Sequence, residues 1–199
     1  MPCLTPAYRA VRPLLFQFQP ETAHGLAFAC GRAFQSVPGA TSLLATLAGA
    51  PAPDLAREVC GLRFPSPVGL DAGLDKGAEL LPLWKALGFG FVEIGTVTPQ
   101  AQPGNPKPRC FRIPEEALIL NRMGFNSEGA EVVARRLDRR PAGLIVGGNL
   151  GKNKLTPDEG ALDDYRAAYR LIAPRVDYIA INVSSPNTPG LRKLQAPEF

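Results

Sequence analysis

The stretch LIVGGNLG, residues 144–151, is followed by a helical pattern at residues 163–172 and then by DYIAINVS, residues 177–184. The first and last of these segments are nearly continuous apolar runs of strand length. Buried strands that are each followed by a helix are typical of a parallel sheet covered by helices. This stretch therefore predicts the α/β fold class.

The same alternation continues toward the N-terminus, with strands predicted at residues 67–73 and 91–98. Helices are predicted at residues 78–87 and 127–139, and a small hairpin around Gly61. A doubly wound sheet and a (β/α)₈ TIM barrel both fit this order. Polar residues at or just beyond four strand ends favour a barrel mouth; they are Lys76, Thr96, Asn149, Asn182 and Ser185.

The length predicts only part of such a barrel. Residues 51–199 contain about four βα units, whereas a closed barrel takes ~250 residues. The chain also stops directly after a polar loop that resembles an active-site loop, without a fourth crossover helix. We therefore expect a truncated sequence that contains the first half of a barrel.

Residues 1–50 form a separate N-terminal segment, predicted as two short amphipathic helices followed by a loop, with a linker at residues 49–56. The two apolar faces consist of Leu14, Leu15 and Phe18, and of Leu26, Ala27, Cys30 and Phe34. Arginines flank both faces, a composition suited to a membrane interface. Packing of both helices on the main domain is the alternative, and the pattern alone favours it.

The composition excludes several classes of protein. The 199 residues include 22 Lys+Arg and 18 Asp+Glu, and 45% are hydrophobic, which excludes a disordered chain. The small excess of positive charge is scattered, so we expect no nucleic-acid partner. The four cysteines form no C-x-x-C pair and His24 is the single histidine, so no metal site is predicted. We recognise neither a signal peptide nor a membrane-spanning run, which favours a cytoplasmic-type compartment.

Three motifs bear on chemistry. GLDAGLDKG, residues 69–77, is a glycine turn that ends near the cation Lys76, and such turns often only connect a strand to a helix. GGNLGKNK, residues 147–154, fails as a P-loop because it lacks the first glycine and the Ser or Thr after the lysine. INVSSPNTPGLR, residues 181–192, crowds amides and hydroxyls after a strand. No histidine lies near Ser185, which disfavours a Ser-His-Asp hydrolase.

Five motifs together resemble the membrane-associated, quinone-linked class of the dihydroorotate dehydrogenase family. They are PVGLDAGLDKG (67–77), GFGFVEIGTVTPQAQPGNPKPRCFR (88–112), LNRMGFN (120–126), GNLGKNKLTP (148–157) and DYIAINVSSPNTPGLRKLQ (177–195). The resemblance covers nearly the whole chain and is strong after Pro65. It implies an FMN-containing (β/α)₈ barrel that oxidises dihydroorotate to orotate in pyrimidine (UMP) biosynthesis, with quinone as the final electron acceptor.

The resemblance also implies roles for individual residues. The cofactor-binding residues would be Ala72, Gly73, Leu74, Asp75, Lys76, Thr96, Asn149 and Asn182. The substrate-binding residues would be Lys76, Asn121, Arg122, Met123, Gly124, Phe125, Asn182 and Asn187. Ser185 would be the catalytic base that removes the C5 proton, and serine at this position, where the soluble class has cysteine, supports the quinone-linked class.

In this class the N-terminal helices form a quinone tunnel, and His24 and Arg112 resemble its polar contacts. The resemblance thus implies peripheral attachment to the cytoplasmic face of a bacterial inner membrane. Asp71 departs from the family pattern and adds a carboxylate near the flavin loop. One interpretation is that this carboxylate pairs with Lys76. Because the second barrel half is missing, we expect the 199 residues to be inactive alone.

Two alternative functions remain open at this point. One is another FMN-dependent barrel oxidoreductase, of the dihydropyrimidine or dihydrouridine type. The other is a truncated, non-catalytic fragment that binds a membrane surface.

Overall fold

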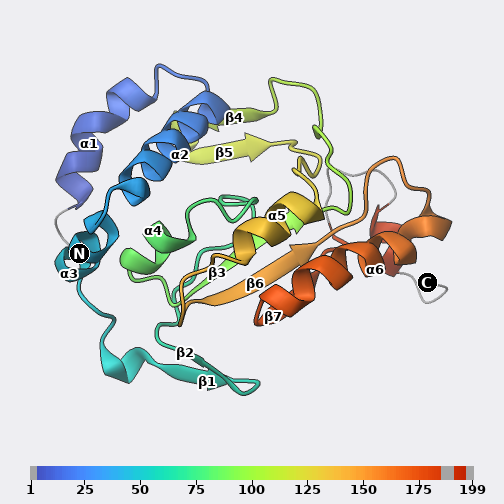
Figure 1. Ribbon diagram of the computed structural model, residues 1–199. Coiled ribbons are helices and arrows are strands. Elements are labelled where there is room, and N and C mark those ends of the chain that lie inside the picture. The colour runs from blue at the N-terminus through green and yellow to red at the C-terminus, as the bar shows by residue number, and fades with distance from the viewer. Residues whose placement is uncertain (1–3, 185–190, 196–199) are drawn as a thin grey trace.

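The computed structural model describes residues 4–184 and 191–195. Within these residues the centre is a three-stranded parallel sheet in the order β3 (Phe91–Val97), β6 (Ile145–Leu150), β7 (Tyr178–Ile181), shown in Figure 1. Both neighbouring pairs are parallel. The predicted α/β class and the parallel sheet are confirmed.

The predicted strand at residues 67–73 forms only an isolated bridge, which joins Leu70 to the outer edge of β3. Leu70 donates its N–H to the carbonyl of Phe91 at 2.9 Å, as in a parallel ladder. The next residue, Asp71, uses its side chain to accept the N–H of Ala72 at 2.9 Å. This local bond competes with strand pairing, so the backbone turns away from the sheet after Leu70.

Three helices follow the strands, as predicted. They are α4 (Leu81–Ala86), α5 (Ala130–Leu137) and α6 (Ala161–Ile172). Figure 1 shows α5 and α6 together on one face of the sheet. Alternate residues of β3, Val92 and Ile94, point into this helical layer and are fully buried with Val146 of β6. The hydrophobic core therefore lies between the sheet and these helices.

On the other face of the sheet, aromatic rings cross neighbouring strands over glycines. A Cβ atom on Gly69 would lie 2.3 Å from the ring of Phe91, and one on Gly147 would lie 2.1 Å from the ring of Tyr178. Any side chain larger than hydrogen would thus collide with a ring. The glycines let Phe91 and Tyr178 lie flat on this face.

Two antiparallel hairpins accompany the sheet. β1 (Arg57–Val59) pairs with β2 (Leu62–Phe64) through a turn in which Cys60 and Gly61 both have positive φ, which confirms the hairpin predicted around Gly61. β4 (Cys110–Ile113) pairs with β5 (Leu118–Asn121). Neither strand of this second hairpin was predicted from the sequence.

The N-terminal segment contains three helices within the described residues, not the predicted two. They are α1 (Leu4–Leu15), α2 (Pro20–Ser36) and α3 (Ala40–Ala48), and α1 ends before Phe18. α3 replaces the predicted loop. Gly39 and Gly49, both with positive φ, bracket this short apolar helix and allow the chain to turn at each end.

α2 packs on the domain by a face that differs from the predicted one. Its buried residues are Ala23, Phe28 and Gly31, whereas the predicted apolar face of Leu26, Ala27, Cys30 and Phe34 is exposed. The buried face thus combines two small residues, Ala23 and Gly31, with the ring of Phe28. No helix in the described part of the chain is long and apolar enough to span a bilayer.

Short 3₁₀ helices complete the described chain. They are η1 (Pro53–Leu55), η2 (Pro114–Glu116), η3 (Asp158–Gly160), η4 (Ala173–Arg175) and η5 (Leu191–Gln195).

Candidate functional site

A cavity of about 340 Å³, here called the smaller cavity, lies at the carboxyl ends of the parallel strands. Thr96 of β3, Asn149 of β6 and Asn182, which directly follows β7, line it. The other lining residues come from loops, except Asn121 at the end of β5; they are Asp71, Ala72, Gly73, Lys76, Asn121, Met123, Gly124, Phe125 and Ser184. The structure thus brings residues predicted for the cofactor and for the substrate around one space.

The three strand-end side chains are hydrogen-bonded to one another. The Thr96 hydroxyl donates to Oδ1 of Asn149 at 2.6 Å. Nδ2 of Asn182 donates to Oγ1 of Thr96 at 3.1 Å and to Oδ1 of Asn149 at 3.3 Å. Thr96 and Asn149 are nearly fully buried. Carboxyl ends of parallel strands meet at one edge of the sheet, which is why these residues converge despite their separation in sequence.

Lys76 is the cation at this site. Its Nζ donates to Oδ1 of Asn126 at 2.7 Å. Burial lowers the pKa of its ammonium to about 8, and the charge of Arg109 acts in the same direction while Glu21 opposes it. Within the described residues, no ion pair joins Lys76 to Asp71, because the Asp71 carboxylate is turned to the N–H of Ala72. The pairing raised as one reading of Asp71 is therefore not formed.

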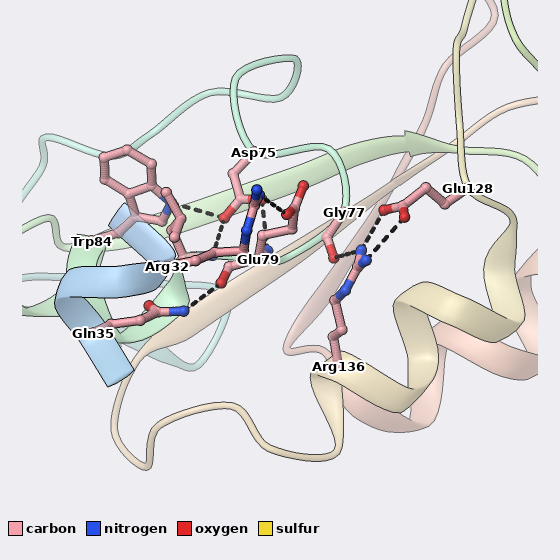
Figure 2. Close-up of polar contacts among 9 residues, drawn as sticks. Arg32, Gln35, Asp75, Gly77, Glu79, Trp84, Glu128 and Arg136 are labelled. Carbon is pink, nitrogen blue, oxygen red and sulfur yellow. Dashed lines mark hydrogen bonds and ion pairs between the residues drawn. The ribbon is translucent and has the colours of Figure 1, made fainter. Parts of the chain in front are cut away.

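Asp75 contributes to the site through its neighbours and not through its own carboxylate. Its carboxylate, fully buried, accepts hydrogen bonds from the N–H groups of Glu79 at 2.7 Å and Leu80 at 2.8 Å. The indole N–H of Trp84 donates a third, at 2.8 Å. Figure 2 shows the carboxylate among these donors. Asp75 thus anchors the loop that contains Lys76, because its carboxylate is hydrogen-bonded to Trp84 of α4 and to the two residues just before that helix.

The same loop also makes polar contacts with two helices, α2 and α5 (Figure 2). Arg32 of α2 forms an ion pair with Glu79 at 2.6 Å, and Gln35 donates to the carbonyl of Glu79 at 2.7 Å. Arg136 of α5 pairs with Glu128 and donates to the carbonyl of Gly77 at 3.1 Å. The loop between Leu70 and α4 is therefore tied to both the N-terminal segment and the helical layer.

Of the predicted run from Asn121 to Phe125, four residues line the smaller cavity. The exception is Arg122, which is exposed and donates to the carbonyl of Pro108 at 3.1 Å. Gly124 and Phe125 both have positive φ, which turns the chain sharply inward. Leu74, predicted for the cofactor, lines the second cavity and not this one.

The second cavity, here called the larger cavity, measures about 630 Å³ and lies between α2, the β4–β5 hairpin and the Lys76 loop. His24 and Arg112, predicted for the quinone side, both line it. The His24 ring stacks on Phe28 with centroids 4.2 Å apart, and burial lowers the pKa of His24. Arg112 donates to the carbonyl of Phe18 at 2.8 Å. The two cavities share four lining residues: Gly73, Lys76, Asn121 and Met123.

Two predicted residues, Ser185 and Asn187, lie outside the described residues. Ser184, the last residue described before them, donates its N–H to Oδ1 of Asn182 at 3.2 Å. Among the residues that are described, no cluster of His, Cys, Asp and Glu is suited to hold a metal ion.

Sequence reasoning missed two residues that support the site. Asn126, to which no role in the site was assigned, accepts the hydrogen bond from Lys76. Gln102 donates from Nε2 to the carbonyl of Phe125 at 2.7 Å, and its Oε1 accepts from Nδ2 of Asn153 at 3.0 Å. Both belong to irregular loops, in which no periodic pattern marks the residues that point inward.

A family model described as dihydroorotate dehydrogenase matches residues 54–198. A dihydroorotate dehydrogenase (quinone) of Mycobacterium bovis is 51% identical over 191 residues, which cover 96% of this chain and 54% of that protein. The protein of the same description from Chloroflexus aurantiacus is 62% identical over 142 residues, or 71% of this chain and 39% of its own length. The chain spans about half the length of these curated relatives.

Solved structures give the same result. A crystal structure of DHODH from Eimeria tenella in complex with ferulenol matches with a TM-score of 0.73 and 41% identity, covering 90% of this chain and 47% of that one. The ligand-free form from the same organism matches with a TM-score of 0.69 and 43% identity, over 79% and 48% of the two chains.

Proposed function

This chain belongs to the dihydroorotate dehydrogenase family, and from that premise we propose that the native protein carrying it oxidises dihydroorotate to orotate in pyrimidine biosynthesis, with quinone as the final electron acceptor. The observation that carries the proposal is the convergence of Lys76, Thr96, Asn149 and Asn182 with the loop at residues 121–125 around the smaller cavity. A planar anion with carbonyl and N–H groups matches such a set of one cation with amides and hydroxyls.

The donors around the smaller cavity fit FMN as the cofactor. Amide N–H groups of Asn149 and Asn182 and the ammonium of Lys76 are suited to the carbonyl and nitrogen atoms of a flat heterocycle. At Gly73, an added Cβ would meet no atom within 4 Å, so the backbone there is open to a ligand. FMN, when bound, supplies the ring that accepts a hydride.

In the proposed reaction, Lys76 supplies positive charge and Ser185 transfers a proton. The Lys76 ammonium attracts and orients the substrate carboxylate. Asn187 and the four residues of the run that line the cavity, Asn121, Met123, Gly124 and Phe125, contact the rest of the substrate. Ser185 acts as general base and removes the proton from C5.

The larger cavity is the proposed route for quinone. Phe28 and the imidazole of His24, whose lowered pKa favours its neutral form, give this cavity an apolar wall beside α2. The exposed apolar face of α2 and the exposed Leu43 and Leu47 of α3 suit a peripheral contact with lipid. We place this contact on the cytoplasmic face of the inner membrane.

Residues 1–50 form the membrane-facing and quinone-facing segment in this proposal, and residues 51–199 form the first half of a (β/α)₈ barrel. The parallel sheet supports this proposal. It has helices on one face and the rings of Phe91 and Tyr178, packed over glycines, on the other, and a barrel likewise has a helical exterior and a packed interior.

The visible spectrum of the native protein tests the proposed activity. We expect bound oxidised flavin that bleaches when dihydroorotate is added without oxygen and recovers when a quinone follows. Dihydrouracil is the matched control, since it lacks the carboxylate that Lys76 would bind, and it should bleach the flavin far more slowly. Equal bleaching by both compounds would assign the protein to another class of flavin oxidoreductase.

Replacing Ser185 tests its role as base. Ser185→Ala should leave the bound flavin spectrum unchanged and slow flavin reduction by ~10²–10⁴-fold, the usual contribution of a positioned general base. The measurement is single-turnover bleaching in a stopped-flow instrument. A rate equal to that of the unchanged protein would remove Ser185 from the mechanism.

A further inference from the structure

We propose that Glu93 is a positioning residue that determines which atoms Asn149 and Asn182 present to a ligand in the smaller cavity. Glu93 lies on β3, three residues before Thr96, and points to the sheet face that carries Phe91 and Tyr178. It does not line the cavity itself. The nature of the ligand rests on the proposed function, whereas the positioning role is argued from the contacts of Glu93 alone.

The carboxylate of Glu93 receives the amide of Asn149. Nδ2 of Asn149 donates to Oε1 of Glu93 at 2.8 Å. A carboxylate only accepts hydrogen bonds, so the NH₂ group of Asn149 must face it. With the amide reversed, two oxygens would face each other across the same distance. Glu93 therefore fixes the orientation of an amide that is otherwise free to turn over.

That orientation passes to the other two polar groups. With Nδ2 held by Glu93, Oδ1 of Asn149 is turned toward Thr96 and accepts the Thr96 hydroxyl hydrogen at 2.6 Å. Thr96 Oγ1, its own hydrogen used, accepts from Nδ2 of Asn182 at 3.1 Å. Nδ2 of Asn182 thereby turns toward the other two groups, and its Oδ1 takes the N–H of Ser184 at 3.2 Å. One carboxylate thus sets the direction of every hydrogen bond in this series.

A second contact orients the carboxylate. The hydroxyl of Tyr178 donates to Oε2 of Glu93 at 3.1 Å. The Tyr178 ring lies over Gly147, where even a methyl group would collide with it. Burial raises the pKa of Tyr178, and the Glu93 charge adds to this, so the hydroxyl keeps its hydrogen and remains a donor. Glu93 is therefore held from both oxygens.

The arrangement has a consequence for recognition. Asn149 has a second N–H, and within the described part of the chain no acceptor bonds to it. With the amide locked, the group left for a ligand is a donor. The strand-end cluster should accordingly select a ligand edge that carries acceptors, such as ring carbonyls or an unprotonated ring nitrogen.

The test compares Glu93→Gln with Glu131→Gln in the native protein. Glu131 is exposed on α5, so the second variant makes the same chemical change away from the cavity. A glutamine at position 93 can face Asn149 with either end, so the amide loses its fixed orientation. We expect FMN affinity, measured by quenching of flavin fluorescence, to fall about tenfold in Glu93→Gln only. We also expect the absorption maxima of the flavin that still binds to shift.

A readout independent of flavin comes from NMR of protein labelled at asparagine side chains. The Asn149 NH₂ signal should move in Glu93→Gln and remain in place in Glu131→Gln. If Glu93→Gln does not fold, Glu93→Asp replaces it, because it keeps the charge but withdraws the carboxylate from Asn149. An Asn149 signal and an FMN affinity unchanged in these variants would overturn the positioning role. Failure of the unchanged protein to bind FMN would overturn the proposed cofactor, while the NMR result would still decide the role of Glu93.

Discussion

Lys76 should make ligand binding depend on pH. Its pKa is lowered to about 8 by burial, so the ammonium is largely charged at neutral pH and is lost as the pH rises above 8. Affinity for orotate should therefore fall above about pH 8, in calorimetric titrations from pH 6 to 10. In Lys76→Met, the affinity should be weak and nearly independent of pH. A flat profile in the unchanged protein would contradict the role of Lys76.

The same pKa shift affects stability with a definite sign. Between about pH 8 and the ordinary lysine value of 10.5, the unfolded chain binds more protons at Lys76 than the folded chain does. The contribution of Lys76 to the free energy of unfolding therefore rises with pH through this window. Below about pH 8, Lys76 is charged in both states, and the free energy of unfolding is lowered by the full cost of burying its ammonium.

Asp75 should matter for folding more than for ligand contact. Asp75→Asn places an NH₂ group among three donors, so we expect the free energy of unfolding to fall by ~3 kcal/mol. Trp84→Phe removes only one of these donors and should cost about 1 kcal/mol. Urea unfolding followed by circular dichroism measures both. Equal losses in the two variants would mean that the indole bond dominates the cluster.

These residues show how far the sequence predicts the site. Thr96, Asn149 and Asn182 were predictable because each lies at a strand end, and parallel strands bring those ends together. Asp75 was predicted for the cofactor because it lies beside Lys76 in a glycine loop, yet its carboxylate faces α4. Spacing in a loop does not reveal the direction of a side chain, since loops have no period.

The helices and strands also divide into those that the sequence predicts and those that it does not. Strands β3, β6 and β7 and helices α5 and α6 were predicted, because their apolar runs and helical periodicity are visible in the sequence itself. The β4–β5 hairpin was missed because its strands are four residues each, too short to show alternation. α3 was missed because nine small and apolar residues between two glycines carry little amphipathic signal.

The docking of α2 depends on a glycine. A Cβ atom on Gly31 would lie 2.8 Å from Cδ1 of Leu80, which is itself buried, whereas one on Gly25 would meet nothing within 4 Å. Gly31→Val should therefore lower the free energy of unfolding by ~1–3 kcal/mol more than Gly25→Val on the same helix. Thermal unfolding of the two variants checks this. Equal melting temperatures would show that α2 does not pack tightly on the domain.

At the scale of the whole molecule, several strands leave apolar side chains exposed. Leu118, Ile119 and Leu120 of β5 and Ile181 of β7 are all exposed. We expect the 199 residues, prepared alone, to self-associate as concentration rises, in sedimentation velocity experiments. Replacing Ile119 and Ile181 with lysine should reduce this association. A monomer at every concentration would show that these side chains do not drive contacts between chains.

Lys76, Gly73, Asn121 and Met123 form a partition with the smaller cavity on one side and the larger cavity on the other. Under the proposed function, this shared wall sets a rule for inhibitor design. A short compound in the larger cavity would leave the wall in place and inhibit without competing with orotate. A longer one that displaces the Lys76 side chain would become competitive with orotate, so adding atoms in that direction would change the type of inhibition as well as its strength.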